Sequence, residues 1–204
     1  LAVTLAKRAH AETKISQNAI SVSYAAVELA KQELGNLHDR QALVIGAGKM
    51  GELTAKHLYD HGLKNMKVVN RTRSKAAHLA NQLGAVGLSM DELEEALLEA
   101  DIVISSTGSN RSVLTKAQMV RVLDKRKPTA NPLLLIDIAV PRDFDPAIAD
   151  LDNVRMYDID NLDGVIQHNL EQRNKEAEKV EGLIAEEIVH FRKWYQSLGV
   201  GPVI

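Results

Sequence analysis

Residues 42–51 read ALVIGAGKMG, an apolar run followed at once by a glycine-rich segment. A short apolar run before glycines is typical of a buried strand, and the residues after the glycines have a helical pattern as far as His61. Gly46, Gly48 and Gly51 thus form a G-x-G-x-x-G pattern between a predicted strand and a predicted helix. This context predicts the phosphate-binding turn of a dinucleotide-binding α/β domain.

Short apolar runs separated by helical stretches continue along the chain. Each run is nearly all apolar, which is typical of parallel strands that are buried on both faces. The predicted strands are 42–45, 66–70, 85–88, 102–104, 133–138 and 154–157. The predicted helices between them are 49–61, 74–83, 90–99 and 115–123, with a loop at 125–132. We therefore expect a doubly wound parallel sheet of the Rossmann type, with the strand order 3-2-1-4-5-6.

Helical patterns flank the expected sheet domain on both sides. Before it, Ser16 or Asn18 is expected to cap a helix from about residue 19 to Leu34. After it, apolar residues three, four or seven positions apart mark one stripe on a helix of about 38 residues, about 57 Å long. The stripe consists of Leu162, Ile166, Leu170, Ala177, Val180, Ile184, Ile188, Phe191, Tyr195 and Leu198. Because such a helix exceeds the span of a small sheet domain, we expect the stripe to contact another domain or another subunit.

The composition excludes several classes of function. The chain contains no cysteine, which excludes disulfides, thiolate zinc sites, iron–sulfur clusters and thiol catalysis within its 204 residues. Lys and Arg number 25 against 27 Asp and Glu, unlike the strongly basic balance of a dedicated nucleic-acid-binding domain. No apolar run approaches the roughly 18 residues that span a bilayer, and no signal peptide is predicted. A cytoplasmic location and no membrane partner are therefore expected.

The end of the second predicted strand indicates which dinucleotide fits. An acidic residue usually stands there and binds the ribose 2′-hydroxyl of NAD. This chain has Asn70, Arg71 and Thr72 instead, with Lys75 shortly after. Arg71 can bind a 2′-phosphate that an acid would repel, so the sequence favours NADPH over NADH. The alternative is that Arg71 and Arg73 are ordinary solvated charges.

The loops after the fourth and fifth predicted strands complete the expected site. Residues 105–108 and 137–143 lie at the edge where open parallel sheets bind ligands. Backbone groups there can border the nicotinamide and its ribose, or the side chains can serve only as turn and cap residues, such as an Asp143 or Asp145 cap. The residues expected to bind the cofactor are Gly46, Ala47, Gly48, Lys49, Met50, Gly51, Asn70, Arg71, Thr72, Lys75, Ser106, Thr107, Gly108 and Ala139.

No catalytic side chain and no metal site are expected within the chain. His57 and His61 are four residues apart, but no glutamate follows His57, so the zinc-protease pattern is missing and both are expected to be solvated. There is no Gly-x-Ser-x-Gly elbow, and Ser105 has no histidine nearby in the sequence. The residues alone therefore predict a cofactor-binding domain without its own acid, base or nucleophile.

Several stretches together resemble the glutamyl-tRNA reductase family, particularly its bacterial members. They are RAHAETKIS at 8–16, SVSYAAVELA at 21–30, GAGKMG at 46–51, NRT at 70–72, ISSTG at 104–108 and DIAVPRD at 137–143. The glycine motif and NRT also occur in proteins similar to shikimate dehydrogenase. The stretch DIAVPRD and the long terminal helix make the resemblance specific.

The resemblance implies a reaction and a division into domains. The family uses NADPH to reduce the glutamyl group of glutamyl-tRNA(Glu) to glutamate-1-semialdehyde, the first step of tetrapyrrole (haem) synthesis. Its nucleophile is a cysteine in an N-terminal domain, its members dimerise through a C-terminal domain, and transfer of the product to glutamate-1-semialdehyde aminomutase is a further expectation. This chain would then comprise a linking helix region (1–35), the NADP-binding domain (36–158) and a spinal helix (159–204), without the catalytic domain and most of the dimerisation domain.

Three other interpretations stay open at this point. One is a complete NADP-linked dehydrogenase of the shikimate type, although the roughly 40 residues before the first strand are too few for a substrate domain. Another is a non-enzymatic module that senses NADP(H), with the long helix as its signalling arm. The third is a structural interaction protein whose Rossmann fold binds no ligand.

Overall fold

The computed structural model describes residues 2–13, 21–127 and 132–197. The chain divides into two compact units. Residues 21–165 form the first unit, which contains the sheet, and the described parts of residues 1–20 and 166–204 form the second.

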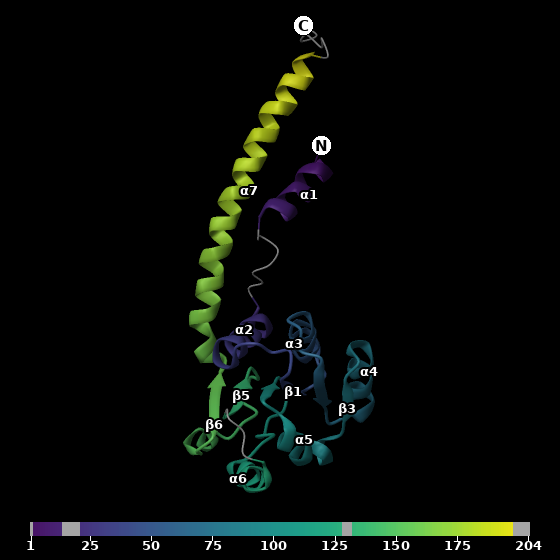
Figure 1. Ribbon diagram of the computed structural model, residues 1–204, viewed down its shortest axis with the longest axis vertical. Helices are drawn as coiled ribbons and strands as arrows, with labels where there is room; N and C mark the ends of the chain where they lie inside the picture. Colours follow the sequence, from purple (N-terminus) through teal and green to yellow (C-terminus); the bar gives the residue numbers. More distant parts are fainter. Residues whose placement is uncertain (1, 14–20, 128–131, 198–204) are drawn as a thin grey trace. The chain divides into compact units, whose positions relative to one another are not determined.

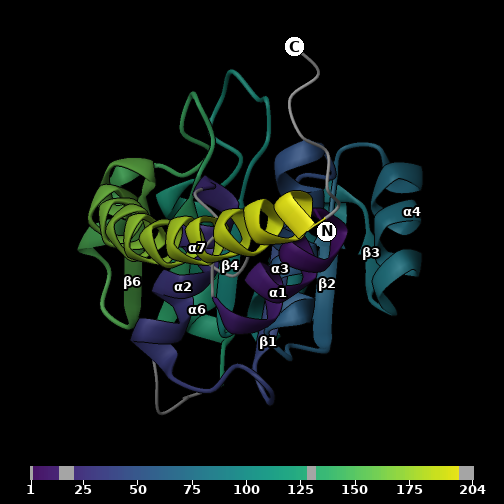
Figure 2. The ribbon, with the colours of Figure 1, turned by 90° about the horizontal axis from the view of Figure 1, so that it is seen from above.

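The first unit is built on a six-stranded sheet in which every pair of neighbours is parallel (Figure 1). Its strands are β1 (Gln41–Ile45), β2 (Asn65–Val69), β3 (Val86–Leu88), β4 (Ile102–Ser105), β5 (Leu133–Asp137) and β6 (Val154–Asp158). They lie in the order β3-β2-β1-β4-β5-β6, so that β3 and β6 form the two edges (Figure 2). The predicted doubly wound fold and its strand order are confirmed.

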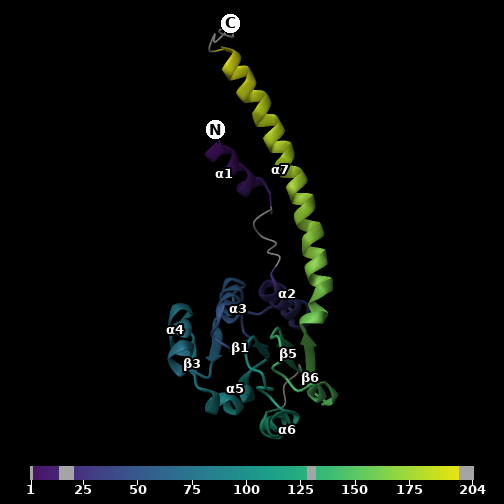
Figure 3. The same ribbon diagram turned by 180° about the vertical axis from the view of Figure 1, so that it is seen from behind.

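Helices cover both faces of this sheet. They are α2 (Val22–Leu34), α3 (Lys49–Asp60), α4 (Arg73–Leu83), α5 (Leu93–Glu99) and α6 (Lys116–Lys125), with short 3-10 helices η1 (Met90–Glu92), η2 (Pro146–Asp150) and η3 (Ile159–Leu162). α2 and α3 lie on one side of the sheet, and α5 and α6 lie on the other (Figures 1 and 3). The stretch predicted as one helix over 90–99 is η1 followed by α5.

β1 shows how the sheet is buried on both faces. Leu43 and Ile45 belong to a core cluster that includes Leu97 of α5 and Met119 of α6. Val44 lies between them in the strand and is also fully buried. Because successive side chains of a strand point to opposite faces, Val44 packs under the other helical layer. This double burial explains why the strand is apolar at every position after Gln41 and does not alternate with polar residues.

The helix before β1 begins later than the sequence predicted. Ser21 caps α2, and its hydroxyl oxygen accepts a hydrogen bond from the backbone N–H of Tyr24 at 3.1 Å. The predicted caps, Ser16 and Asn18, lie outside the described residues. At the other end, Gly35 follows the last helical residue as predicted and donates its N–H to a carbonyl of the last turn.

α2 packs along α3 through a small polar and aromatic cluster. The rings of His57 and His61 both lie edge-on to the ring of Tyr24, with centroids 5.5 Å and 5.7 Å away. Nε2 of His61 also lies 3.2 Å from a carboxylate oxygen of Glu28. The prediction that the two histidines are solvated is therefore wrong. Their four-residue spacing places both on the α3 face that meets α2, where they are partly buried.

The second unit contains α1 (Ala2–Glu12) and most of α7 (Asp163–Ser197), a single helix of 35 residues. The long helix predicted after the sheet is thus present. Arg8 of α1 forms ion pairs with Glu12 at 2.8 Å and with Glu186 of α7 at 3.3 Å. Within residues 2–13, 21–127 and 132–197, no helix is both long enough and apolar enough to cross a membrane.

The environment of His57 predicts how stability depends on pH. Burial lowers the pKa of His57, and the neighbouring charge of His61 acts in the same direction. The unfolded chain then binds a proton at this position more readily than the folded chain. The free energy of unfolding should therefore fall as the pH drops below about 6.5, the ordinary pKa of histidine.

The substitution His57→Phe, which keeps a ring against Tyr24, should reduce this pH dependence. We expect the variant to lose less stability than the wild type between about pH 7.5 and about pH 5.5, measured by urea unfolding. The control is His190→Phe, at a side chain that is 69% exposed, which should lose as much stability as the wild type. Equal losses in all three proteins would contradict the role of His57.

Candidate cofactor site

The glycine loop joins the end of β1 to the first turn of α3. Gly46 has a φ of +105°, which residues with a side chain rarely adopt, and a Cβ there would lie 3.0 Å from the carbonyl oxygen of Ser106. A Cβ on Gly51 would lie 2.0 Å from the carbonyl oxygen of Gly46. The helix therefore approaches the loop too closely for a side chain at Gly51, and the backbone conformation and the Ser106 carbonyl disfavour one at Gly46.

Gly48 differs because it borders open space. A Cβ at this position would meet no atom within 4 Å. Gly48 is the N-cap of α3, and no side chain caps the helix there. The free N–H groups of the first turn, and the positive end of the helix dipole, are therefore available to a negatively charged group that enters this space.

Asn70 ties the glycine loop to the turn after β2. Its side-chain oxygen accepts a hydrogen bond from the N–H of Ala47 at 3.3 Å, and its side-chain nitrogen donates to the carbonyl of Thr72 at 3.1 Å. Next to it, the N–H of Gly46 donates to the carbonyl of Val69 at 2.8 Å. Because the amide is engaged at both ends, Asn70 shapes the site through these two loops.

Exposed polar side chains follow Asn70 at the start of α4. Arg71, Thr72 and Lys75 are all exposed and line one cleft. Thr72 is the N-cap of α4, but its hydroxyl makes no capping hydrogen bond and is free to meet a ligand. None of the described residues that line this cleft is acidic. The cleft therefore suits an anion.

The cleft has a volume of about 290 Å³ and lies at the carboxyl ends of β1, β2 and β4. It brings together most of the residues predicted from the sequence, namely Gly46, Ala47, Gly48, Asn70, Arg71, Thr72, Lys75, Ser106, Thr107 and Gly108. Met90, Ser109 and Val113 also line it, and the sequence analysis missed them. No local motif marks these three residues, because only the order of the strands brings their loops to the cleft.

A second hollow of about 230 Å³ adjoins the cleft and shares Ala47 and Lys75 with it. Its wall also contains Glu52 and His78, from α3 and α4. The carboxylate of Glu52 makes this hollow less suited to a phosphate than the cleft, whose lining carries Arg71 and no acid.

Besides Gly51, three predicted residues lie outside the cleft lining. Lys49 is exposed at the first position of α3. Met50 faces α2, where its carbonyl oxygen and its sulfur lie 3.3 Å and 3.8 Å from the hydroxyl of Ser23. Ala139 is buried, and its N–H donates to the carboxylate of Asp137 at 3.0 Å.

The hydroxyl of Ser106 is buried and has no hydrogen-bond partner within the described chain. It lies behind the glycine loop, 3.3 Å and 3.2 Å from where Cβ atoms on Gly46 and Gly51 would stand. An unpaired buried hydroxyl costs free energy, which a water molecule or a ligand oxygen would recover. The open space at Gly48 fits a dinucleotide whose pyrophosphate lies on the loop.

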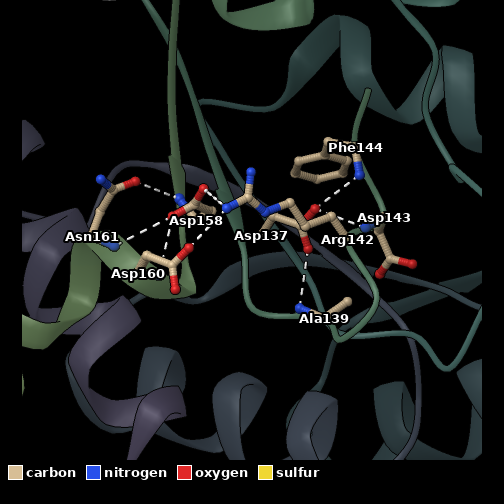
Figure 4. A network of polar contacts seen from close by, with 8 residues as sticks. All are labelled: Asp137, Ala139, Arg142, Asp143, Phe144, Asp158, Asp160 and Asn161. Carbon is tan, nitrogen blue, oxygen red and sulfur yellow. Dashed lines mark hydrogen bonds and ion pairs between the residues drawn. The ribbon is translucent and has the colours of Figure 1, made fainter. Parts of the chain in front are cut away.

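Two buried aspartates hold the loops after β4 and β5. Asp137 accepts hydrogen bonds from the backbone N–H groups of Asp143 and Phe144, at 2.8 Å each (Figure 4). Asp143 accepts from the hydroxyl of Ser105 at 2.6 Å and from both the N–H and the hydroxyl of Thr107. Burial raises the pKa of Asp137, although the N–H groups around it act in the opposite direction.

These contacts assign roles that the sequence left open. The hydroxyl of Thr107 donates to Asp143 and accepts from the N–H of Ser109 at 3.1 Å, so it shapes the cleft wall. Asp143 holds that wall, and Asp145 caps η2 through the N–H of Ala147, as one of the two predicted caps.

The sheet order and the glycine loop, with an open cleft above both, define a dinucleotide-binding domain of the Rossmann class. A family-wide sequence profile described as Shikimate / quinate 5-dehydrogenase matches residues 28–165. The chain belongs to this family.

Within this family, the chain is similar to glutamyl-tRNA reductases. It is 55% identical over 203 residues to the glutamyl-tRNA reductase of Halalkalibacterium halodurans, which covers 100% of the chain and 44% of that protein. The structure of glutamyl-tRNA reductase from Methanopyrus kandleri matches with a TM-score of 0.81 and 42% identity, over 97% of this chain and 49% of that one. The chain thus spans less than half the length of these relatives.

A more distant structure shares the fold. The nucleotide-binding domain of glutamyl-tRNA reductase from Thermoplasma volcanium matches with a TM-score of 0.55 and 16% identity, over 76% of this chain and 96% of that one.

The two kinds of glycine in the loop should respond differently to a methyl group. Gly51→Ala forces a carbon against the Gly46 carbonyl and should destabilise the fold by about 2 kcal/mol or more. Gly48→Ala should cost less than about 1 kcal/mol, since the added methyl meets open space, although alanine is a poor N-cap. It should nevertheless weaken dinucleotide binding by at least about tenfold, because it obstructs the approach of the pyrophosphate to the backbone.

Urea unfolding and calorimetric titration with NADPH measure the two effects separately. A Gly48→Ala protein that binds the dinucleotide as tightly as the wild type would contradict the position assigned to the pyrophosphate.

Proposed function

We propose that this chain binds NADPH and presents it for the reduction of the glutamyl group of glutamyl-tRNA(Glu) to glutamate-1-semialdehyde. The observation that carries the proposal is the 55% identity over the whole chain to a glutamyl-tRNA reductase. The anion-suited cleft, with Arg71 and Lys75 in its lining and no acid, supports NADPH as the cofactor. NADPH would supply the hydride, and the chain's own residues bind and orient it.

The proposed roles of the residues depend on their positions. The pyrophosphate would lie over Gly46, Ala47 and Gly48. It would face the first turn of α3, which Lys49 and Met50 begin and where Gly51 lets the helix approach the loop. Ser106 supports the loop from behind. The adenosine 2′-phosphate would lie among Arg71, Thr72 and Lys75, next to Asn70. The nicotinamide end would lie toward Thr107 and Gly108, with Ala139 beneath the neighbouring loop.

The reaction needs a nucleophile that these 204 residues lack. We propose that a cysteine elsewhere in the full-length protein takes the glutamyl group from the tRNA as a thioester. Hydride addition to the thioester carbonyl and departure of the thiolate then give the aldehyde. In this account residues 1–35 form a linking helix region, 36–158 the NADP-binding domain and 159–204 a spinal helix that leads to a dimerisation domain.

Further partners belong to the same proposal. The exposed apolar side chains of α7, among them Ile184, Ile188 and Phe191, support a contact with another part of the protein. We propose a homodimer, a cytoplasmic location and transfer of the aldehyde to glutamate-1-semialdehyde aminomutase, since the product is reactive.

A second candidate is the NADP-linked oxidation of shikimate or quinate, which the description of the family profile over residues 28–165 favours. The decisive experiment uses the full-length protein, purified and mixed with NADPH and glutamyl-tRNA(Glu). The proposal predicts NADPH oxidation that depends on the charged tRNA, and loss of that activity in the Gly48→Asp variant. Reduction of NADP+ by shikimate or quinate, without tRNA-dependent oxidation of NADPH, would establish the second candidate instead.

The assignment of the 2′-phosphate is tested by Arg71→Ala. Removing this guanidinium should weaken NADPH binding by about 1.5–3 kcal/mol, the range for a charge-assisted hydrogen bond, and leave NADH binding nearly unchanged. Arg73→Ala is the matched control, because Arg73 is equally exposed but does not line the cleft. Calorimetric titrations with both cofactors measure the affinities, and equal losses for NADPH and NADH would contradict the assignment.

A further inference from the structure

Arg142 connects the loop after β5 to the end of β6 (Figure 4). One terminal nitrogen of its guanidinium lies 2.7 Å from the carboxylate of Asp158 and 2.8 Å from that of Asp160. The Asp158 side chain is 17% exposed and that of Asp160 is 76% exposed. Asp158 is the better shielded of the two partners, since solvent weakens an exposed ion pair, whereas the contact with Asp160 is also a hydrogen bond.

Asp158 also organises the turn from which α7 starts. Its carboxylate accepts hydrogen bonds from the N–H groups of Asp160 and Asn161, and its own N–H donates to the side chain of Asn161 at 2.8 Å. The resulting 3-10 helix, η3, passes directly into α7, because Asp163 already has helical backbone angles. Arg142 therefore forms an ion pair with the residue that caps this turn.

The other side of Arg142 leads to the cofactor cleft. The next residue, Asp143, accepts hydrogen bonds from the N–H and hydroxyl of Thr107, which lines the cleft. The N–H of Asp143 is in turn held by the buried Asp137. Between these fixed points residues 140–142 are exposed, with Val140 76% accessible to solvent. Arg142 is the only charged side chain of residues 138–142, and it holds this loop to η3.

We propose that Arg142 is a positioning residue that couples binding in the cofactor cleft to the order of η3 and the first turn of α7. The contacts run from Thr107 to Asp143, along the backbone to Arg142, and from there to Asp158. A ligand that contacts Thr107 adds a restraint that the hydrogen bonds to Asp143 and the backbone pass to the guanidinium of Arg142. This inference rests on the proposed binding of NADPH in the cleft.

Hydrogen exchange of the backbone amides, measured with and without saturating NADPH, tests the coupling. Residues 159–165 do not line the cleft. We nevertheless expect NADPH to slow their exchange by about fivefold or more, at the lower limit of common coupling between sites. In Arg142→Met this slowing should disappear, while the NADPH affinity stays within about threefold of the wild type, since Arg142 does not line the cleft.

Three further variants make the result specific to this contact. Arg142→Lys keeps a cation and should restore part of the slowing. Asp158→Asn keeps a side-chain oxygen that can cap the turn but removes the charge that pairs with Arg142. The slowing of exchange should therefore disappear in this variant as well. Arg155→Met is the matched control, because Arg155 lies on β6, as Asp158 does, but pairs with Glu33 of α2. This variant should keep the slowing of exchange.

The possible outcomes separate this inference from the proposed function. If the wild type does not bind NADPH, the proposed cofactor is wrong. If NADPH binds and exchange at 159–165 does not change, or changes equally in Arg142→Met and the wild type, the coupling through Arg142 is wrong and the binding site stands.

Discussion

The close approach of the first turn of α3 to the carbonyl of Gly46 is the constraint on which the rest of the site depends. A Cβ on Gly51 would lie 2.0 Å from that oxygen, so only glycine lets the helix start there. The tight start directs the free N–H groups of α3 toward the open space beside Gly48. It also brings the loop against Ser106, which follows β4, so that the carboxyl ends of the neighbouring strands β1 and β4 border the same cleft. Backbone packing therefore places the N–H groups that, together with Arg71 and Lys75, suit the cleft to an anion.

Around this fixed centre, side-chain hydrogen bonds within the protein set the shape of the cleft. Asn70 joins the glycine loop to the turn before α4, and Asp143 holds Thr107 in the opposite wall. Arg142, the neighbour of Asp143, extends the same set of contacts to the turn where α7 starts. Burying a carboxylate such as Asp143 is costly unless it is paired, and its hydrogen bonds fix the loops that carry its partners. The loops can then keep their positions although most of their surface is exposed.

The fold could be predicted from the sequence because the central strands are nearly all apolar and the glycine motif stands between the first strand and its helix. The site could be predicted only in part. Arg71 lies beside the cleft because it follows the carboxyl end of β2, which opens at the binding edge of the sheet, and Lys75 follows in the first turn of α4. Val113 reaches the cleft through the order of the strands, which no local motif records. The prediction for His57 is wrong because its helix meets α2, and the partner of a helix face does not follow from the sequence of that helix alone.

The most direct test of the account is a calorimetric titration of the chain with NADPH and with NADH at the same ionic strength. The account predicts binding of one NADPH per chain, at least about tenfold tighter than NADH, which corresponds to about 1.4 kcal/mol for the 2′-phosphate. Equal affinity for the two cofactors would contradict the selectivity assigned to the residues after β2. Binding of neither would contradict the central claim that the glycine loop and its cleft form a dinucleotide site.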